Sequence, residues 1–125
     1  MAIGERTLAL AEASFASGHE SRVNEDAWCG HAEGRGVEVS GLYAHAENFY
    51  TEAIGESSHA EGGSSMAVGD NSHAEGWYSE ARGKASHSEN YSRAFGDYSH
   101  AEGLNTFAGG EASHAEGKAV ISSGY

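Results

Sequence analysis

The stretch Ser72-His73-Ala74-Glu75-Gly76 is one copy of a short motif that recurs along most of this 125-residue chain. The copies, some with small variations, place a histidine at every fourteenth position, with one interval a residue shorter, at His31, His45, His59, His73, His87, His100 and His114. A catalytic motif has no reason to appear seven times at a fixed interval, whereas a structural repeat does. Self-similarity at constant spacing therefore predicts a stacked architecture.

The 14-residue unit divides into two halves that share one pattern. Residues 72–78 and 79–85 both read Ser-x-Ala-x-Gly-x-x, where x is a variable residue. The underlying period is therefore seven, and about 18 halves, or nine full coils, account for almost the whole chain. The fifth position is nearly always Gly, and Asn48 and Asn90 are two of its exceptions. Asn is the non-glycine residue that best tolerates positive φ, so we expect this position to form a left-handed turn rather than a packing contact.

Alternation within each half favours a β-strand over a helix. A coiled coil also has a period of seven, but it needs large apolar residues at two positions, and here the repeating residues are Ser, Ala and Gly. Successive side chains of a strand point to opposite faces, so Ser and Ala face one side while His and Glu face the other. The sequence thus predicts an all-β fold, a flattened parallel β-roll or solenoid of 14-residue coils with a narrow interior of Ser and Ala.

Two segments depart from the repeat. Residues 23–29 contain two extra residues, Trp28 and Cys29, and have Glu25 where Gly is expected, so we predict a bulge or irregular coil there. Residues 86–91 are one residue short, which predicts a tighter corner. Neither irregularity divides the repeat, and we expect a single β-roll domain over residues 1–125.

Charge and hydropathy exclude several classes of function. Seven basic residues against 19 acidic ones give a net charge of −12, whereas nucleic-acid-binding domains carry a basic surface and anionic membranes attract basic segments. No apolar run reaches the roughly 18 residues of a membrane helix, and the first ten residues lack the pattern of a signal peptide. We therefore expect no nucleic-acid partner and no membrane insertion by this segment.

The outward-facing histidines are accompanied by an equally regular set of glutamates, namely Glu33, Glu47, Glu61, Glu75, Glu89, Glu102 and Glu116. We expect each His to hydrogen-bond a Glu of an adjacent coil or chain. No metal or other cofactor is expected, because imidazoles stacked about 5 Å apart supply one ligand per level. A metal-binding scaffold stays an alternative, since imidazole suits Zn, Cu and Ni. Catalysis is not expected, because Ser72 and His73 point to opposite faces and cannot pair as nucleophile and base.

Aromatic residues gather at the corners that follow the histidine-bearing strands. These residues are Phe49, Tyr50, Trp77, Tyr78 and Tyr91. The first two pairs are two coils apart in the sequence, which places them roughly 10 Å apart along one edge. Aromatic side chains are enriched in binding hot spots, so this edge is a candidate ligand-binding surface. The alternative is that the rings pack over neighbouring corners or across subunits.

The repeat resembles that of a known family of bacterial surface proteins. The segments Ala2-Ile3-Gly4, Ala53-Ile54-Gly55 and Ala67-Val68-Gly69 are similar to the signature of the YadA-like head of trimeric autotransporter adhesins, a left-handed parallel β-roll whose repeats are similar in length to this one. The Ser-His-Ala-Glu-Gly form resembles related repeats in fibrous proteins of bacteria and their phages.

That resemblance implies a homotrimer of parallel chains around one axis at an extracellular bacterial or virion surface. It implies a non-enzymatic structural or attachment module with a host-surface protein or glycan as partner; a phage tail-fibre or appendage segment is the alternative. In the family signature, apolar residues flanking Ala face the subunit contact, and here His and Glu take those positions. We therefore expect the His and Glu column to lie at the trimer interface, with the more mixed outward column of the other strands as the alternative.

Overall fold

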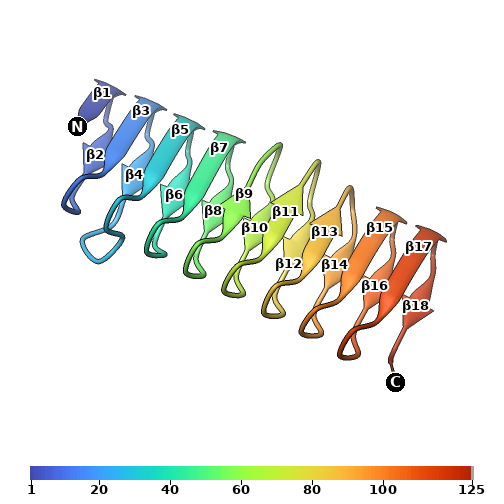
Figure 1. The fold of residues 1–125 in the computed structure, drawn as a ribbon. Coiled ribbons are helices and arrows are strands. Elements are labelled where there is room, and N and C mark those ends of the chain that lie inside the picture. Colours follow the sequence, from blue (N-terminus) through green and yellow to red (C-terminus); the bar gives the residue numbers. More distant parts are fainter. Residues whose placement is uncertain (125) are drawn as a thin grey trace.

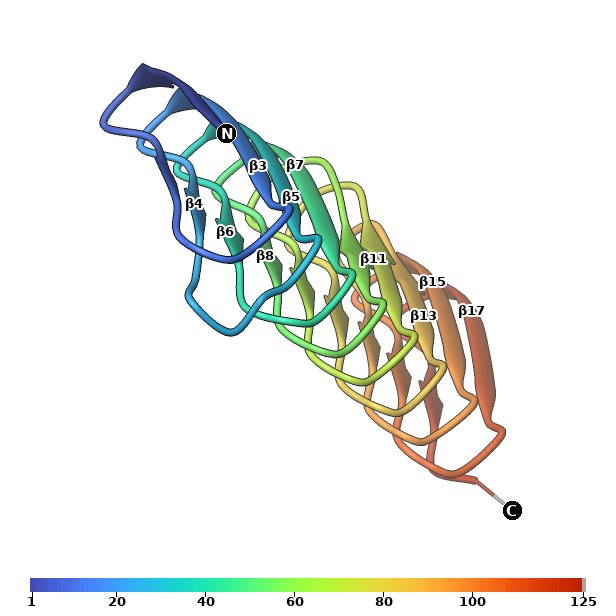
Figure 2. The same ribbon diagram turned by 60° about the vertical axis from the view of Figure 1, so that its left-hand side comes forward.

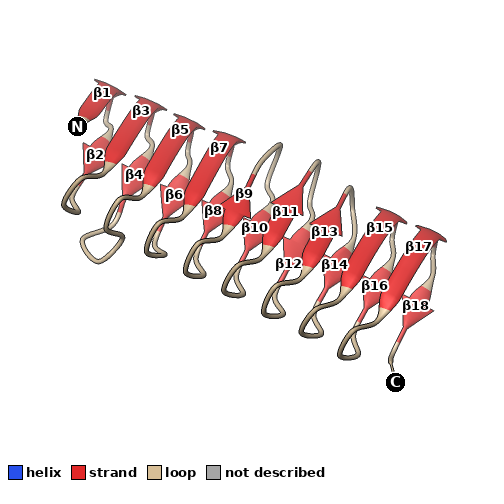
Figure 3. Ribbon diagram, viewed as in Figure 1, coloured by secondary structure: helices blue, strands red, loops and turns tan. Residues whose placement is uncertain are grey.

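The chain folds into a parallel β-solenoid of two nine-stranded sheets, as the computed structural model of residues 1–124 shows (Figure 1). Coils stack along one axis from the N-terminal end to the C-terminal end, and each contributes one strand to each sheet (Figures 1 and 2). All regular structure is strand, joined by turns and loops, within those residues (Figure 3). The predicted all-β solenoid of about nine 14-residue coils is confirmed.

One sheet carries the histidines and is called here the histidine sheet. Its strands are β1 (Ala2–Glu5), β3 (Phe15–His19), β5 (His31–Arg35), β7 (His45–Phe49), β9 (His59–Ala60), β11 (His73–Glu75), β13 (His87–Glu89), β15 (His100–Leu104) and β17 (His114–Lys118). The opposite sheet consists of two-residue strands: β2 (Leu8–Ala9), β4 (Arg22–Val23), β6 (Glu38–Val39), β8 (Glu52–Ala53), β10 (Met66–Ala67), β12 (Glu80–Ala81), β14 (Arg93–Ala94), β16 (Phe107–Ala108) and β18 (Ile121–Ser122).

The register places like residues directly above one another. His73 pairs with His59 on one side and with His87 on the other, and Ala74 pairs with Ala60 and Ser88.

No helix in residues 1–124 is long and apolar enough to cross a membrane.

The interior is a narrow column of small side chains, as the alternation predicts. Alanines of both sheets, such as Ala74 and Ala81, are fully buried. Where the larger Val23 and Val39 enter the same column, the facing first position is Gly30, and a Cβ there would lie 2.9 and 3.0 Å from their Cγ1 atoms. The glycine thus makes the room that the valines use.

Most buried first-position serines donate a hydrogen bond to a backbone carbonyl, whereas Ser72 and Ser113 have no partner within residues 1–124. Ser58 Oγ donates to Gly55 O at 2.7 Å, and Ser86 Oγ donates to Gly83 O at 2.7 Å. A buried hydroxyl without a partner would be destabilising. The preference for Ser at the first position therefore follows from its small volume and from this bond.

The fifth position behaves differently in the two halves of a coil, which corrects the prediction that it is a turn position throughout. After the histidine strands it is left-handed, as at Gly76 with φ +88° and Asn48 with φ 82°. After the opposite strands it is not, and glycine is required by close packing: a Cβ on Gly69 would lie 2.1 Å from Gly83 O in the next coil. The backbone therefore repeats once per full coil rather than once per half-coil.

The two irregular segments lie at corners. Residues 24–30 form a protruding loop between β4 and β5, the widest loop at the lower edge in Figure 1, while Val23 itself stays buried and in register with Val39. In the short unit, Asn90 and Tyr91 are both left-handed, with φ 50° and 40°. Two consecutive left-handed residues close that corner with one residue fewer, so His87 still pairs with His100.

Candidate functional site

The seven repeat histidines form a continuous stack on the outer face of the histidine sheet. Each is the first residue of its strand, so the parallel register superposes the rings. Neighbouring ring centroids are 4.5 to 5.0 Å apart and the planes differ by 0 to 28°. This set is called the histidine ladder: His31, His45, His59, His73, His87, His100 and His114. In the coil before it, Phe15 takes the histidine position and meets His31 edge-on at 4.9 Å.

The glutamates lie beside the ladder, two residues further along each strand, and pair with it inside one chain. Nε2 of His87 is 3.0 Å from Oε1 of Glu75 in the preceding coil, and Nε2 of His73 is 3.4 Å from Oε1 of Glu61. At the first rung the partner is on the same strand, with His31 Nε2 3.2 Å from Glu33 Oε2. Carboxylates of adjacent coils are therefore within reach without a second chain.

The ladder is half-buried, and its imidazoles differ in how well they are satisfied. Nε2 of His45, His59 and His100 is buried and has no hydrogen-bond partner. Nε2 of His59 lies 3.5 Å from Glu47 Oε1 but does not form a hydrogen bond with it. The two side chains form an ion pair only when the ring is protonated.

The pKa of His45 is lowered from its usual 6.5 by burial, with further lowering from the neighbouring imidazoles of His31 and His59. Glu47 and Glu33 oppose that shift more weakly. At neutral pH the His45 ring is therefore mainly uncharged.

The geometry gives no serine nucleophile beside a histidine base at the repeat motif. Ser72 is buried in the interior while His73 projects from the outer face of its strand. The opposite orientation of adjacent strand residues keeps the two side chains apart in every coil.

The aromatic edge lies along the corners that follow the histidine strands. Phe49 and Tyr50 meet at 4.5 Å, and Tyr78 lies 6.3 Å from Trp77 and 5.5 Å from Tyr91. These five side chains are between 38% and 58% exposed. Between the two groups, the coil of Gly63 presents no ring, and a Cβ on Gly63 would lie 2.5 Å from the Trp77 indole. The rings thus pack over neighbouring corners and still expose a large part of their surface.

A hollow at the opposite edge of the solenoid was not predicted from the sequence. The protruding loop after β4 and the corner after β6 line it with Asp26, Trp28, Leu42 and Tyr43, and Ile54 and Glu56 complete it. Trp28 is visible in the sequence as an extra residue, but Leu42 and Tyr43 occupy variable corner positions. Only the register of the folded coils shows that the loop reaches them.

The central coils match a known family model. The YadA head domain repeat matches the chain twice, over residues 53–72 and 60–79. These coils are similar to YadA head repeats. The same backbone register continues through the coils on both sides of the matched segment, so the predicted resemblance to a YadA-like head is confirmed. A search of curated proteins found no match. YadA heads are structural adhesin modules.

Proposed function

We propose that this chain is a rigid, non-enzymatic segment of a trimeric attachment module exposed on a bacterial or phage surface. The match of two overlapping windows to the YadA head repeat carries this proposal. The fold supports it, because every coil hydrogen-bonds to the next over the full length of both sheets and gives a stiff rod. Neighbouring genes for an adhesin anchor or for phage tail proteins would distinguish the two kinds of surface.

We place the trimer interface on the histidine sheet. Its outer face presents the same pair of side chains in seven successive coils, which suits a threefold axis because each level of the axis repeats the same surroundings. The opposite sheet instead presents a mixture, including Glu52, Arg82 and Phe107. Glutamates buried at such an interface need the neighbouring imidazoles, because an uncompensated buried charge costs several kcal/mol.

The mass of the untagged chain in solution tests the trimer. Three chains of 13.0 kDa give about 39 kDa by analytical ultracentrifugation, and a 13.0 kDa monomer at micromolar concentration would overturn the proposal. Glu61→Arg on the histidine sheet is expected to dissociate the trimer, whereas the matched change Glu52→Arg on the opposite sheet is expected to leave it intact. The reverse result would place the axis on the mixed face.

Attachment is assigned to the aromatic edge formed by Phe49, Tyr50, Trp77, Tyr78 and Tyr91. Exposed aromatic rings grouped over neighbouring corners are the side chains most often found in binding hot spots. Trp77→Ala is expected to weaken binding to immobilised host glycans or surface proteins about tenfold. Tyr98→Ala, an exposed aromatic on the opposite edge, is the matched control. Equal binding by both variants would exclude the aromatic edge.

A further inference from the structure

We propose that the histidine ladder binds divalent transition-metal ions, each held by three histidine and glutamate side chains from two consecutive coils. Four groups combine two histidines with one glutamate, and a fifth combines one histidine with two glutamates. The groups are His31–Glu33–His45, His45–Glu47–His59, His73–Glu75–His87, His87–Glu89–His100 and Glu102–His114–Glu116. The expectation of one ligand per level therefore understates the site, because consecutive levels act together.

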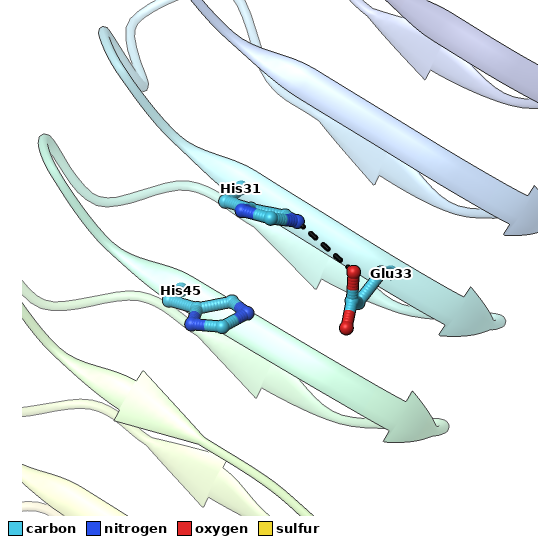
Figure 4. A group of neighbouring side chains, drawn as sticks. All are labelled: His31, Glu33 and His45. Atoms are coloured by element: carbon cyan, nitrogen blue, oxygen red, sulfur yellow. Dashed lines mark hydrogen bonds and ion pairs between the residues drawn. The ribbon is translucent and has the colours of Figure 1, made fainter.

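The potential ligand atoms of each group lie near one another. Figure 4 shows His31 and His45 projecting side by side from β5 and β7, with the Glu33 carboxylate beside them. In every group the potential ligand atoms lie within 4.8 Å of one another. Two ligand atoms at about 2.1 Å from one tetrahedral Zn²⁺ lie roughly 3.4 Å apart. The rings of each pair are nearly parallel, so both imidazoles must tilt for their in-plane lone pairs to point at one ion, and the side chains, about one-third or more exposed, have room to do so.

The unpartnered nitrogens are a second, independent observation. Nε2 of His45 is buried without a hydrogen-bond partner, although buried polar atoms are nearly always satisfied. Nε2 of His59 and Nε2 of His100 also make no hydrogen bond, but they lie 3.5 Å from Glu47 Oε1 and 3.4 Å from Glu89 Oε1. His45 and His59 are the two imidazoles of one group, and His100 belongs to another. A metal ion between the rungs would engage these lone pairs.

The donor set selects the class of ion. Two imidazoles and a carboxylate are a ligand set typical of Zn²⁺, with a fourth position left for water or another donor, and imidazole also suits Ni²⁺ and Cu²⁺. Mg²⁺ and Ca²⁺ prefer oxygen ligands alone. The net charge of −12 further favours cation binding. Every ligand comes from one chain, so the proposal does not depend on the trimer.

Shared residues limit the number of ions. His45 belongs to two groups and His87 to two others, and a residue that ligates one ion is not free for the next. At most three ions therefore bind per chain: one at the first pair of groups, one at the second pair, and one at Glu102–His114–Glu116.

Zinc titration of the untagged chain tests the proposal. The protein is treated with chelator, dialysed and titrated with Zn²⁺ by calorimetry, in a Cys29→Ser background that removes the exposed free thiol. Up to three Zn²⁺ per chain are expected, with a raised Tm, and Mg²⁺ is expected neither to bind nor to compete. His45→Gln and His87→Gln are each expected to remove one ion, and the double variant two.

His19→Gln is the matched control, because His19 ends its strand and lies outside the ladder. It is expected to leave the stoichiometry unchanged, and circular dichroism checks that each variant keeps its strands. No Zn²⁺ binding, or the same stoichiometry in His45→Gln as in His19→Gln, would overturn the proposal. Sedimentation with and without Zn²⁺ separates this result from the oligomeric state.

Discussion

At the residue scale, the last position of each half-coil has a left-handed backbone that could not be predicted from its side chains. In every coil this residue is left-handed, and most of these residues are not glycine: Arg6, Ala13, Glu20, Tyr43, Ser57, Tyr78, Ala85, Tyr98 and Ala112 are examples with φ 52 to 58°. The conformation turns the amide back towards the preceding coil, as Ala85 N–H donates to Asp70 O at 2.8 Å. That bond offsets a conformational cost of about 1–2 kcal/mol per residue.

Ala85→Gly is expected to stabilise the chain by about 0.5 kcal/mol. Glycine relieves the left-handed strain and keeps the amide bond, although it gains entropy in the unfolded state. Ala81→Gly, at a buried strand position, is the control and is expected to destabilise by about 0.5–1 kcal/mol. Urea unfolding measures both. A loss of stability in Ala85→Gly equal to that in Ala81→Gly would contradict the strain at this corner.

The size of the interior sets a second residue-scale prediction. Ala74→Leu is expected to destabilise the chain by at least about 1–3 kcal/mol, because the extra atoms have no space in a column of fully buried small residues. Ala74→Ser is expected to cost far less, since Ser88 occupies the paired position in the next coil and bonds to Ser92 O at 2.7 Å. Thermal unfolding compares the two, and an equally tolerated leucine would show that the interior is not close-packed.

At the element scale, stacking like side chains makes the histidine sheet sensitive to protonation. The pKa of His45 is lowered in the folded chain, first by burial and then by His31 and His59, against the weaker opposing effect of Glu47 and Glu33. As the pH falls below 6.5, His45 therefore takes up a proton more readily in the unfolded chain than in the folded one. The stability that depends on an uncharged His45 is fully present above pH 6.5, and it is lost as the pH falls towards the pKa of His45 in the folded chain.

The melting temperature in chelator-containing buffer checks this expectation between pH 7.5 and pH 5. We expect the melting temperature to fall as the pH is lowered. The fall is expected to be smaller in His45→Gln, which removes the imidazole with the lowered pKa. His19→Gln serves as the control and should retain the full dependence. A melting temperature that does not change over this range would show that the ladder is not coupled to folding.

How far the sequence determines the elements can be read from two positions. Ala74 and His73 alternate in a fixed pattern, so their faces, the narrow interior and the stacked imidazoles follow from strand geometry alone. The role of the fifth position does not follow from strand geometry. Glycine is required at Gly69 because the next coil approaches closely, and it is required at Gly76 because φ is positive there.

Contacts between coils were harder to predict than faces. Each His was predicted to pair with a Glu of an adjacent coil or chain, and the His87–Glu75 pair has this form, but the pairing of His31 with Glu33 on the same strand was not predicted. An irregularity was predicted at residues 23–29, and the loop lies at residues 24–30. Its approach to Leu42 and Tyr43 depends on tertiary packing that no local pattern encodes.

At the scale of the whole molecule, a backbone that repeats once per full coil predicts which deletions the fold accepts. Deleting residues 58–71 removes one full coil and joins Ser57 to Ser72, which restores the sequence order of strands in both sheets. Since each coil contacts only its neighbours, we expect a folded, shorter rod with a modestly lower Tm.

Deleting residues 58–64 removes half a coil and is the matched comparison. Every later strand would move to the other sheet, and left-handed fifth positions such as Gly76 would occupy corners built for the other backbone geometry. A much larger loss of stability is expected in thermal unfolding. If both deletions were tolerated equally, the two halves would be interchangeable and the backbone would repeat every half-coil.

Because like residues lie directly above one another, each added coil moves everything beyond it outward by one strand spacing, about 4.8 Å. The length of the rod therefore changes in discrete steps. Adding or removing whole coils changes the distance between the two ends of the rod without requiring new kinds of contact.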